Sequence, residues 1–294
     1  MKENAVGRTV LITGATGSVS SALLGALRNT KLNVRALVRD EAKGAKLRAS
    51  GITTVVGDLD DSSTLPHAFE GVDDLWLLTA VGPRAPENSM NAVWAARKAG
   101  VKRVVRLSAI GAAHDAPTRN GRLHALSDNE LQNSGLRWTI LRPHFFAQNL
   151  LGSASTIAGH GAFYLNMGER PLGMIDARDV GDVAAQILSD DSTRHDGKIY
   201  TPTGPQTLTF ADAAKEIGRV IAKPVNYVPV SDEAAREAIL QMGMSPWLTG
   251  VYIEYGQAYG SGWGDFTTTH VFDVLGREPR SFATFAQDHA AAFK

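Results

Sequence analysis

The sequence predicts an α/β protein with a doubly wound, mainly parallel sheet and a smaller α+β lobe near its carboxyl end. Short apolar runs alternate with helical patterns through the first half of the chain, and a glycine turn joins the first run to the first helix. After Asn149 the alternation loosens, and glycine, proline and aromatic residues become frequent. Alternation over short connections requires right-handed crossovers and helices on both faces of a parallel sheet. We therefore expect a main domain over residues 1–150 and a smaller lobe, interleaved with the main sheet, over residues 151–294.

The first element is a strand followed by a helix, within residues 9–27. Residues 10–12 form an apolar run typical of a buried parallel strand, and apolar residues recur at helical spacing from residue 19. Gly14 permits a tight turn between them, and Gly17 lets the backbone approach a phosphate. Bare N–H groups and the helix dipole suit a pyrophosphate there. We expect a dinucleotide to bind here, through Gly14, Thr16, Gly17, Ser18 and Val19, with Ser20 as the small residue that packs the helix on its strand.

Further strands and helices follow in alternation. The predicted strands are residues 33–38, 52–56, 74–79, 103–107 and 137–141, and the predicted helices are residues 41–50, 62–69, 85–99 and 122–133. Ligands of such sheets bind beyond the carboxyl ends of the strands. The residues that stand at those ends are Gly14, Arg39, Asp58, Thr79, Ser108 and Pro143.

The second half shows helical patterns with two short strand-like pieces between them. The helical patterns cover residues 178–188, 210–221, 231–242 and 281–293, and the strand-like pieces are residues 198–201 and 225–228. No low-complexity linker and no internal repeat separates the halves. This organisation indicates a lobe that covers a substrate rather than an independent domain.

Composition restricts the class of protein. Lysine plus arginine equals aspartate plus glutamate, so the formal net charge is zero and favours neither nucleic acid nor a membrane surface. The chain has no cysteine, which excludes disulfides, thiolate nucleophiles and cysteine-ligated metals. The first eight residues are too few and too polar for a signal peptide, and no apolar run approaches a membrane span. We expect a cytoplasmic monomer or homodimer, and the scattered histidines predict no metal site.

Arg39 follows the second predicted strand, at the position that faces the adenosine ribose of a dinucleotide. A carboxylate there would hold the ribose hydroxyls, whereas an arginine can bind a 2′-phosphate and stack on adenine. Arg35 and Lys43 add positive charge nearby. The pattern favours NADP(H), while the neighbouring Asp40 keeps NAD(H) open. The alternative for Arg39 is a solvated side chain at the entry of a helix.

Short motifs are spread over nearly the whole chain. They are TGATG at residues 13–17, GDL at 57–59, SAIG at 108–111, SGLRWTILRP at 134–143, FFAQN at 145–149, DARDVGDVA at 176–184 and LGREPRSF at 275–282. In combination they resemble the NmrA-like branch of the atypical short-chain dehydrogenases/reductases. The resemblance implies a Rossmann fold with a small carboxyl-terminal lobe and NAD(P) in the glycine turn. Members of that branch include quinone reductases, triphenylmethane dye reductases, benzylic ether reductases and cofactor-sensing regulators.

The resemblance also implies roles for individual residues around the cofactor. Asp58 resembles the residue that accepts from the adenine amino group, with Leu59 against the ring, and its alternative is the N-cap of the helix near residue 62. The segment Thr79, Ala80 and Val81 is expected to line the ribose side by its backbone. Pro143, His144 and Phe145 are expected to close over the nicotinamide.

The catalytic group is harder to predict. Standard members of the superfamily use Ser, Tyr and Lys, the tyrosine giving a proton to a carbonyl oxygen. Ser108 stands at the strand end expected for the serine, but no tyrosine occurs between Thr79 and Phe163. The NmrA-like H-x-x-x-E pattern reads His124 to Asp128 in this chain. His124 therefore resembles the residue near the missing lysine, and Asp128, one helical turn later, is expected to orient its ring.

Two mechanisms fit these residues. In the first, hydride passes to an electron-poor acceptor, such as a quinone or an extended aromatic ketone, whose product is a stabilised phenolate that needs little proton help. In the second, His124 or His144 donates the proton, directly or through water or Ser108. The alternative for His124 is a structural histidine on a helix.

Aromatic side chains suggest a flat, apolar ligand. We expect the substrate to contact the wall that follows Pro143 and an aromatic lid within residues 242–266, whose alternative is a core for the small lobe. The expected substrate contacts are Phe145, Phe146, Asn149, Trp247, Tyr252 and Trp263. The sequence thus predicts an NAD(P)H-dependent reductase of quinone-like or polycyclic aromatic compounds, including polyketide ketones. The alternative is an NAD(P)-sensing regulator without turnover, and an epimerase is disfavoured by the missing tyrosine.

Overall fold

The central sheet has seven parallel strands in the order β3-β2-β1-β4-β5-β6-β8. This computed structural model describes residues 7–294, so residues 1–6, most of the segment judged unsuited to a signal peptide, lie outside the described part. The α/β fold with a parallel sheet, predicted from the sequence, is confirmed. The strands are β1 (Thr9–Ile12), β2 (Asn33–Val38), β3 (Thr53–Val56), β4 (Asp74–Leu77), β5 (Arg103–Leu107), β6 (Arg137–Leu141) and β8 (Lys198–Tyr200).

The strand order reverses beside β1. This strand pairs with β2 on one side and with β4 on the other, so the chain moves outward to β3 and then returns to the middle of the sheet. The residues Val10, Leu11 and Ile12 of β1 are fully buried, as expected for a strand covered on both faces. The reversal leaves a crevice beyond the carboxyl ends of β1 and β4, where such sheets bind ligands.

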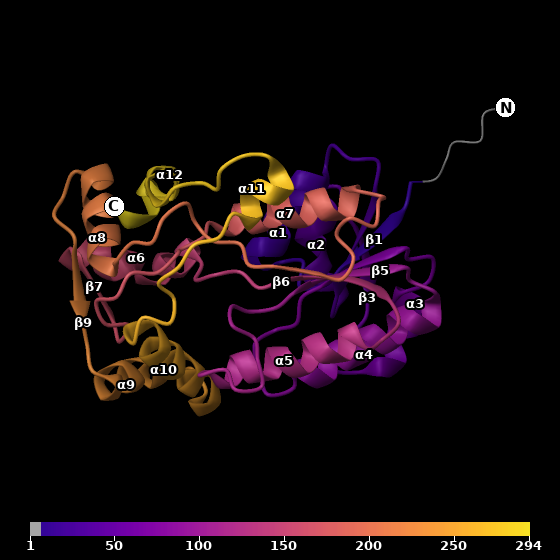
Figure 1. Cartoon of the computed structure of the whole chain (residues 1–294), viewed down its shortest axis with the longest axis horizontal. Coiled ribbons are helices and arrows are strands. Elements are labelled where there is room, and N and C mark those ends of the chain that lie inside the picture. The colour runs from indigo at the N-terminus through magenta and orange to yellow at the C-terminus, as the bar shows by residue number, and fades with distance from the viewer. Residues whose placement is uncertain (1–6) are drawn as a thin grey trace. The chain divides into compact units, whose positions relative to one another are not determined.

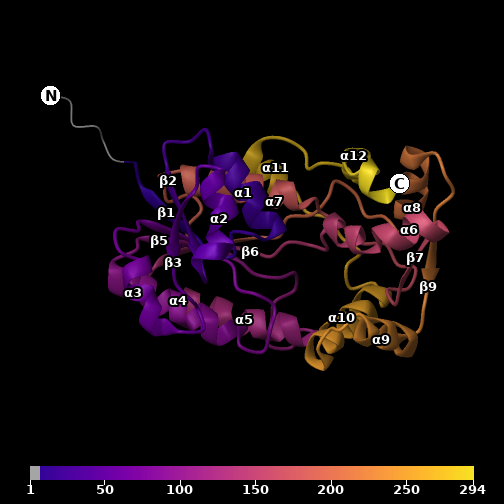
Figure 2. The ribbon, with the colours of Figure 1, turned by 180° about the vertical axis from the view of Figure 1, so that it is seen from behind.

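Helices cover both faces of this sheet (Figures 1 and 2). One face carries α1 (Ser18–Leu27), α2 (Glu41–Ala49) and α7 (Ala177–Ser189), and the other carries η1 (Ser62–Thr64), α3 (Leu65–Ala68), α4 (Ala85–Ala99) and α5 (Arg119–Gln132). Close packing on the first face depends on Gly181 of α7, because a Cβ there would lie 2.7 Å from the Cβ of Ala22. The second face is sealed by a cluster that joins Leu75 of β4 to Ala92 and Val93 of α4.

The chain forms two compact units and passes between them several times. The first comprises the described part of Met1–Ser108, Leu123–Arg142 and Val180–Tyr200, and it contains the large sheet. The second comprises Ala109–Arg122, Pro143–Asp179 and Thr201–Lys294. The helices α5 and α7 are divided between the two units. The other elements of the second unit are η2 (Ala147–Ser153), α6 (Ala154–His160), β7 (Ala162–Leu165), α8 (Phe210–Ile221), β9 (Asn226–Pro229), α9 (Asp232–Gln241), α10 (Pro246–Gly260), α11 (His270–Leu275), α12 (Phe282–Asp288) and η3 (Ala290–Phe293).

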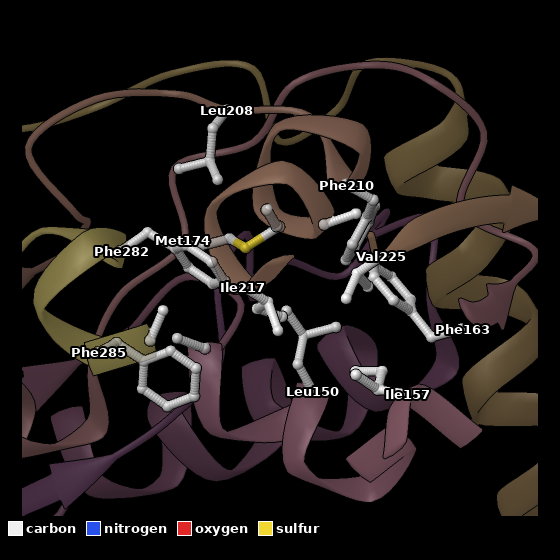
Figure 3. Packing of buried hydrophobic residues seen from close by; sticks show 14 of the residues in the cluster. Leu150, Ile157, Phe163, Met174, Leu208, Phe210, Ile217, Val225, Phe282 and Phe285 are labelled. Atoms are coloured by element: carbon white, nitrogen blue, oxygen red, sulfur yellow. The ribbon is translucent and has the colours of Figure 1, made fainter. Parts of the chain in front are cut away.

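The second unit has its own apolar core and a small parallel sheet, β7 with β9. Figure 3 shows Phe163 of β7, Phe210 and Ile217 of α8, and Phe285 of α12 meeting in this core. A capping box starts α8, in which Thr209 accepts from the backbone N–H of Asp212 and Asp212 accepts from that of Thr209. Within residues 7–294, no helix combines the length and apolarity needed to cross a membrane.

The main departure from the predicted elements is α10. We expected an aromatic lid with several glycines there and predicted no helix, whereas residues 246–260 form one regular helix, capped by Ser245 with Pro246 in its first turn. The glycines serve close contacts rather than turns: a Cβ on Gly250 would lie 2.9 Å from the Arg119 guanidinium, and one on Gly256 would lie 2.1 Å from Asn166. The strand β7 was also missed, and the helix predicted over residues 281–293 is divided into α12 and η3.

Candidate functional site

The turn between β1 and α1 exposes backbone donors. Gly14 has φ +60°, and a Cβ there would lie 2.6 Å from Leu78 Cδ2, so both conformation and space require glycine. Gly17 is the N-cap of α1 and has no side chain to bond the first N–H groups of the helix. Those groups also lack intrahelical acceptors, and the helix dipole adds partial positive charge. The turn is therefore built to bind an anion.

A cavity of about 350 Å³ opens at this turn. Its walls come from the segments that follow β1, β2, β3 and β4, at the reversal of strand order. The lining includes the predicted cofactor residues Gly14, Thr16, Gly17, Arg39, Asp58, Leu59 and Ala80. The sequence therefore located residues from four separate segments that the fold gathers around one cavity.

Two cations line the part of the cavity that follows β2. Arg39 and Lys43 are both lining residues, whereas Arg35 donates from Nη1 to the carbonyl of Glu70 at 2.8 Å and is not part of the lining. Asp40 caps α2 by accepting from the backbone N–H of Lys43 at 2.8 Å. That hydrogen bond is the main cause that lowers the pKa of Asp40. Asp40 is the carboxylate because of which NAD(H) remained an alternative cofactor, and it already has a structural partner.

Asp58 and Leu59, which follow β3, also line the cavity. The N-cap of η1 is Asp61, which accepts from the backbone N–H of Ser63 at 3.1 Å, so the alternative assignment of Asp58 as this cap is wrong. One Asp58 oxygen, Oδ1, accepts from the backbone N–H of Asp60 at 3.0 Å. Asn91 of α4 donates to the carbonyl of Leu59 at 2.9 Å and holds this loop in place.

The lining differs from the prediction at several positions. Within residues 7–294 it does not include the predicted residues Ser18, Val19, Thr79 and Val81, and the Val81 side chain is half exposed. Sequence reasoning missed Asn88 of α4, which lines the cavity and whose buried Oδ1 has no hydrogen-bond partner in the described part of the chain. No motif marks Asn88, because its place depends on how α4 packs beside the loop after β3.

Ser108 and His124 lie in a polar cluster at the carboxyl end of β5. The buried Ser108 donates from Oγ to Asp128 Oδ2 at 2.8 Å. Asp128 was expected to orient His124, but its oxygens accept from Arg106, Ser108 and Arg142 instead. The neighbour of His124 is Arg106, whose Nη2 lies 3.3 Å from the ring Nδ1. The cluster thus joins the predicted residues through arginines that the sequence did not single out.

His144 belongs to the second unit and is 2% exposed. Its Nδ1 accepts from the backbone N–H of Phe145 at 2.8 Å, and its Nε2 lies 2.9 Å from the carbonyl of Gly264. The proton therefore resides on Nε2 and is directed at a carbonyl oxygen. Burial lowers the pKa of His144 to about 4. While these bonds hold, the ring has no N–H to give to a substrate.

The predicted substrate residues also belong to the second unit. Phe145 packs edge-on against Phe210 and Tyr259, and Trp263 contacts Tyr259 with ring centroids 5.5 Å apart. These rings adjoin the apolar core, in agreement with the alternative that this region builds the small lobe. The remaining predicted residues are partly or largely exposed: Phe146, Asn149, Trp247 and Tyr252. The expected contacts of Pro143, Phe145 and the others with ligands stay predictions.

Metal-type side chains are not gathered in the described part of the chain. No group of three or more His, Cys, Asp or Glu side chains among residues 7–294 is placed to hold a metal ion.

The chain is similar to proteins that bind or use NAD(P)H. Residues 14–191 match a family model described as NAD(P)H-binding. An NAD(P)H azoreductase of Xenophilus azovorans is 38% identical over 97% of this chain and 99% of its own length. Quinone oxidoreductase 2 of Escherichia coli is 31% identical over 80% of this chain and 82% of its own length. The crystal structure of that NADPH-dependent enzyme with NADPH superposes with a TM-score of 0.85 at 26% identity, covering 95% of this chain and 99% of the other.

Proposed function

The chain belongs to the NAD(P)H-binding, NmrA-like family of atypical short-chain dehydrogenases/reductases and is an NAD(P)H-dependent reductase, and we propose that it reduces flat, electron-poor acceptors of the quinone class with NADPH. The observation that carries this proposal is the cavity at the glycine turn, where backbone donors and two cations lie at the reversal of strand order. When bound, the nicotinamide cofactor supplies a hydride to the acceptor.

The charges around the cavity favour NADP(H) over NAD(H). Arg39 and Lys43 offer guanidinium and ammonium donors to a 2′-phosphate, and charge-assisted hydrogen bonds of this kind are stronger than neutral ones. A preference for NAD(H) would need a carboxylate directed at the ribose hydroxyls. Asp40, the nearest carboxylate in sequence, caps α2 instead. We therefore assign the 2′-phosphate to Arg39 and Lys43.

The cavity also suits the rest of a dinucleotide. The N–H groups past Gly17 suit the pyrophosphate, and Asp58 keeps one oxygen, Oδ2, to accept from an adenine amino group. The unpartnered Oδ1 of Asn88 is a second acceptor in the lining. A buried acceptor without a partner is unfavourable by about 1–3 kcal/mol, so a donor on the bound cofactor would relieve it.

The acceptor class follows from the groups available for proton transfer. The chain lacks the Tyr-x-x-x-Lys pair, so an acceptor whose reduced form is a stabilised phenolate is favoured over a simple ketone. Relatives named as an azoreductase and a quinone oxidoreductase support a flat, conjugated acceptor. We propose that the second unit recognises it through aromatic side chains such as Phe146, Trp247 and Trp263. Polycyclic aromatic ketones are the second acceptor class.

Steady-state oxidation of NADPH tests this function directly. The purified full chain is mixed with NADPH and a panel of quinones, polycyclic ketones and azo dyes, and the NADPH absorbance band is followed. Sustained oxidation that is fastest with quinones supports the proposal. Faster turnover of azo dyes would show that the acceptor class is azo compounds and not quinones. Calorimetric binding of NADPH without oxidation by any acceptor would instead favour a cofactor-sensing regulator.

A further inference from the structure

Asp128 is the centre of a largely buried polar cluster at the carboxyl end of β5, next to the strand that borders the cofactor cavity. We call the set of Ser89, Arg106, Ser108, His124, Asp128 and Arg142 the Asp128 cluster. The Asp128 side chain is fully buried. Its Oδ1 accepts from Arg106 Nε at 2.9 Å, and its Oδ2 accepts from Ser108 Oγ at 2.8 Å and from Arg142 Nε at 3.0 Å. These bonds satisfy the carboxylate without His124.

Arg106 determines which nitrogen of His124 carries the proton. Its Nη2 lies 3.3 Å from His124 Nδ1, and a guanidinium has donors only, so Nδ1 must be the acceptor. A neutral imidazole with an accepting Nδ1 carries its proton on Nε2. Arg106 cannot swing away freely, because Nε is bound to Asp128 and Nη1 donates to Ser89 Oγ at 3.0 Å. The contact therefore selects the Nε2–H tautomer.

The charges of the cluster keep the ring neutral. Two guanidinium groups, of Arg106 and Arg142, face the single carboxylate of Asp128, which leaves an excess of one positive charge beside His124. Burial, followed by Arg106 and Arg142, lowers the pKa of His124 to about 3. At neutral pH His124 is thus a hydrogen-bond donor and not an acid, since a neutral imidazole does not give up its remaining proton.

Ser108 has the complementary role. An ionised carboxylate only accepts, so the hydroxyl proton of Ser108 belongs to the bond with Asp128. The Ser108 oxygen can then accept but has no proton left for a substrate. The cluster thus contains a neutral donor, His124 Nε2–H, and a hydroxyl acceptor, Ser108 Oγ, beside its two guanidinium groups.

We propose that Arg106 is a positioning residue that fixes His124 as a neutral Nε2–H donor to the oxygen of the acceptor. This inference rests on the proposed reductase function. The hydride leaves NADPH and adds to the acceptor, the negative charge gathers on the acceptor oxygen, and the proton that neutralises it comes from water. Preorganised donors aimed at developing charge are a large source of rate enhancement. The net positive charge of the cluster stabilises the same oxygen.

Nitrogen-15 NMR of histidine-labelled full-length protein tests the tautomer without any turnover. His124→Phe identifies the signals, and we expect wild-type His124 to show a bare Nδ1 and a protonated Nε2 from pH 8 to pH 5. Arg106→Met is expected to yield mixed tautomers and a raised pKa, and Arg106→Lys, which keeps a donor, is expected to retain the wild-type signature. A wild-type ring that is protonated on Nδ1, or on both nitrogens at pH 7, overturns the proposal even if no variant folds.

Arg103→Met is the matched control. Arg103 lies on the same strand, is equally buried and pairs with the buried Asp74, so its loss removes a similar ion pair without touching His124. We expect Arg103→Met to leave the His124 spectrum unchanged. For turnover, His124→Phe is expected to lower kcat about 100-fold with an unchanged KM for NADPH. Full kcat in His124→Phe overturns the donor role, whereas no turnover in the wild type refutes the reductase function and leaves the tautomer result standing.

Discussion

The indole Nε1 of Trp76 donates a 2.9 Å hydrogen bond to Ser20 Oγ, inside the first unit. Both side chains are fully buried, and Ser20 Oγ in turn donates to the carbonyl of Thr13 at 3.3 Å. Two consecutive hydrogen bonds thus connect Trp76 on β4 to Thr13 after β1 through Ser20 of α1. Ser20 occupies the position at which a small residue packs the helix on its strand. A serine in this position is explained by its neighbour, because a buried indole N–H needs an acceptor.

Removing that acceptor is expected to destabilise the protein. Ser20→Ala leaves the Trp76 N–H buried without a partner, which is unfavourable by about 1–3 kcal/mol. Urea unfolding of the variant measures this loss as a lower midpoint with an unchanged m-value. The exposed neighbour Ser21 supplies the control, since Ser21→Ala is expected to change the free energy of unfolding by no more than about 0.5 kcal/mol. Equal stabilities of the two variants would show that the Trp76 bond contributes nothing.

Two glycines on either side of the start of α1 are expected to respond oppositely to alanine. Gly14→Ala places a side chain at φ +60° and within 2.6 Å of Leu78 Cδ2, so we expect a loss of at least about 1–2 kcal/mol of stability. Gly25 lies in α1 with no atom within 4 Å of an added Cβ, so Gly25→Ala is expected to stabilise by about 0.5–1 kcal/mol. Thermal unfolding of both variants checks the signs, and a stabilised Gly14→Ala would contradict the assigned turn.

The fold was predictable because local signals and burial agree between residues 9 and 141. Each apolar run ended at a glycine or polar residue, and β2, α4, β5 and β6 have the predicted boundaries. In the second unit, α8 was predicted because its apolar residues recur at helical spacing, and its capping box then emerged from the structure. The helix α10 was missed because its glycines make room for Arg119 and Asn166, which lie more than 80 residues away in sequence. Such contacts leave no local signal.

The site was predictable where backbone geometry decides it and unpredictable where side-chain partners do. Gly14 and Gly17 follow from the turn itself. In contrast, the partner of His124 is Arg106, on a strand that reads as part of an apolar run, so the helical spacing to Asp128 gave the wrong neighbour. Asn88 was missed for a similar reason, since only the packing of α4 brings it to the cavity.

Cofactor choice is expected to depend on Arg39. Arg39→Asp removes a donor to the 2′-phosphate and adds a repelling charge, so we expect NADPH binding to weaken at least about 10-fold, from the 1.5–3 kcal/mol of a charged hydrogen bond. NADH binding is expected to change much less, because NADH lacks that phosphate. Calorimetry with both nucleotides measures the ratio of the two dissociation constants. Arg35→Ala is the control, since Arg35 is held by the Glu70 carbonyl, and an equal loss for NADPH and NADH in Arg39→Asp would refute the assignment.

The free energy of unfolding is expected to decrease as the pH is lowered, because the buried ring of His144 stays neutral in the folded chain. Its pKa is about 4 in the folded chain against a reference of 6.5, so below pH 6.5 the unfolded chain binds the extra proton. The titration of this ring therefore leaves the free energy of unfolding unchanged above pH 6.5. Between pH 6.5 and about pH 4 that free energy falls progressively, by about 3 kcal/mol in all. His144→Phe is expected to be less stable at pH 7 but to show a shallower fall in unfolding free energy between pH 6.5 and 4. The exposed His67 is the control, and a His144→Phe slope equal to that of His67→Ala would mean that His144 is protonated in the folded protein as readily as in the unfolded one.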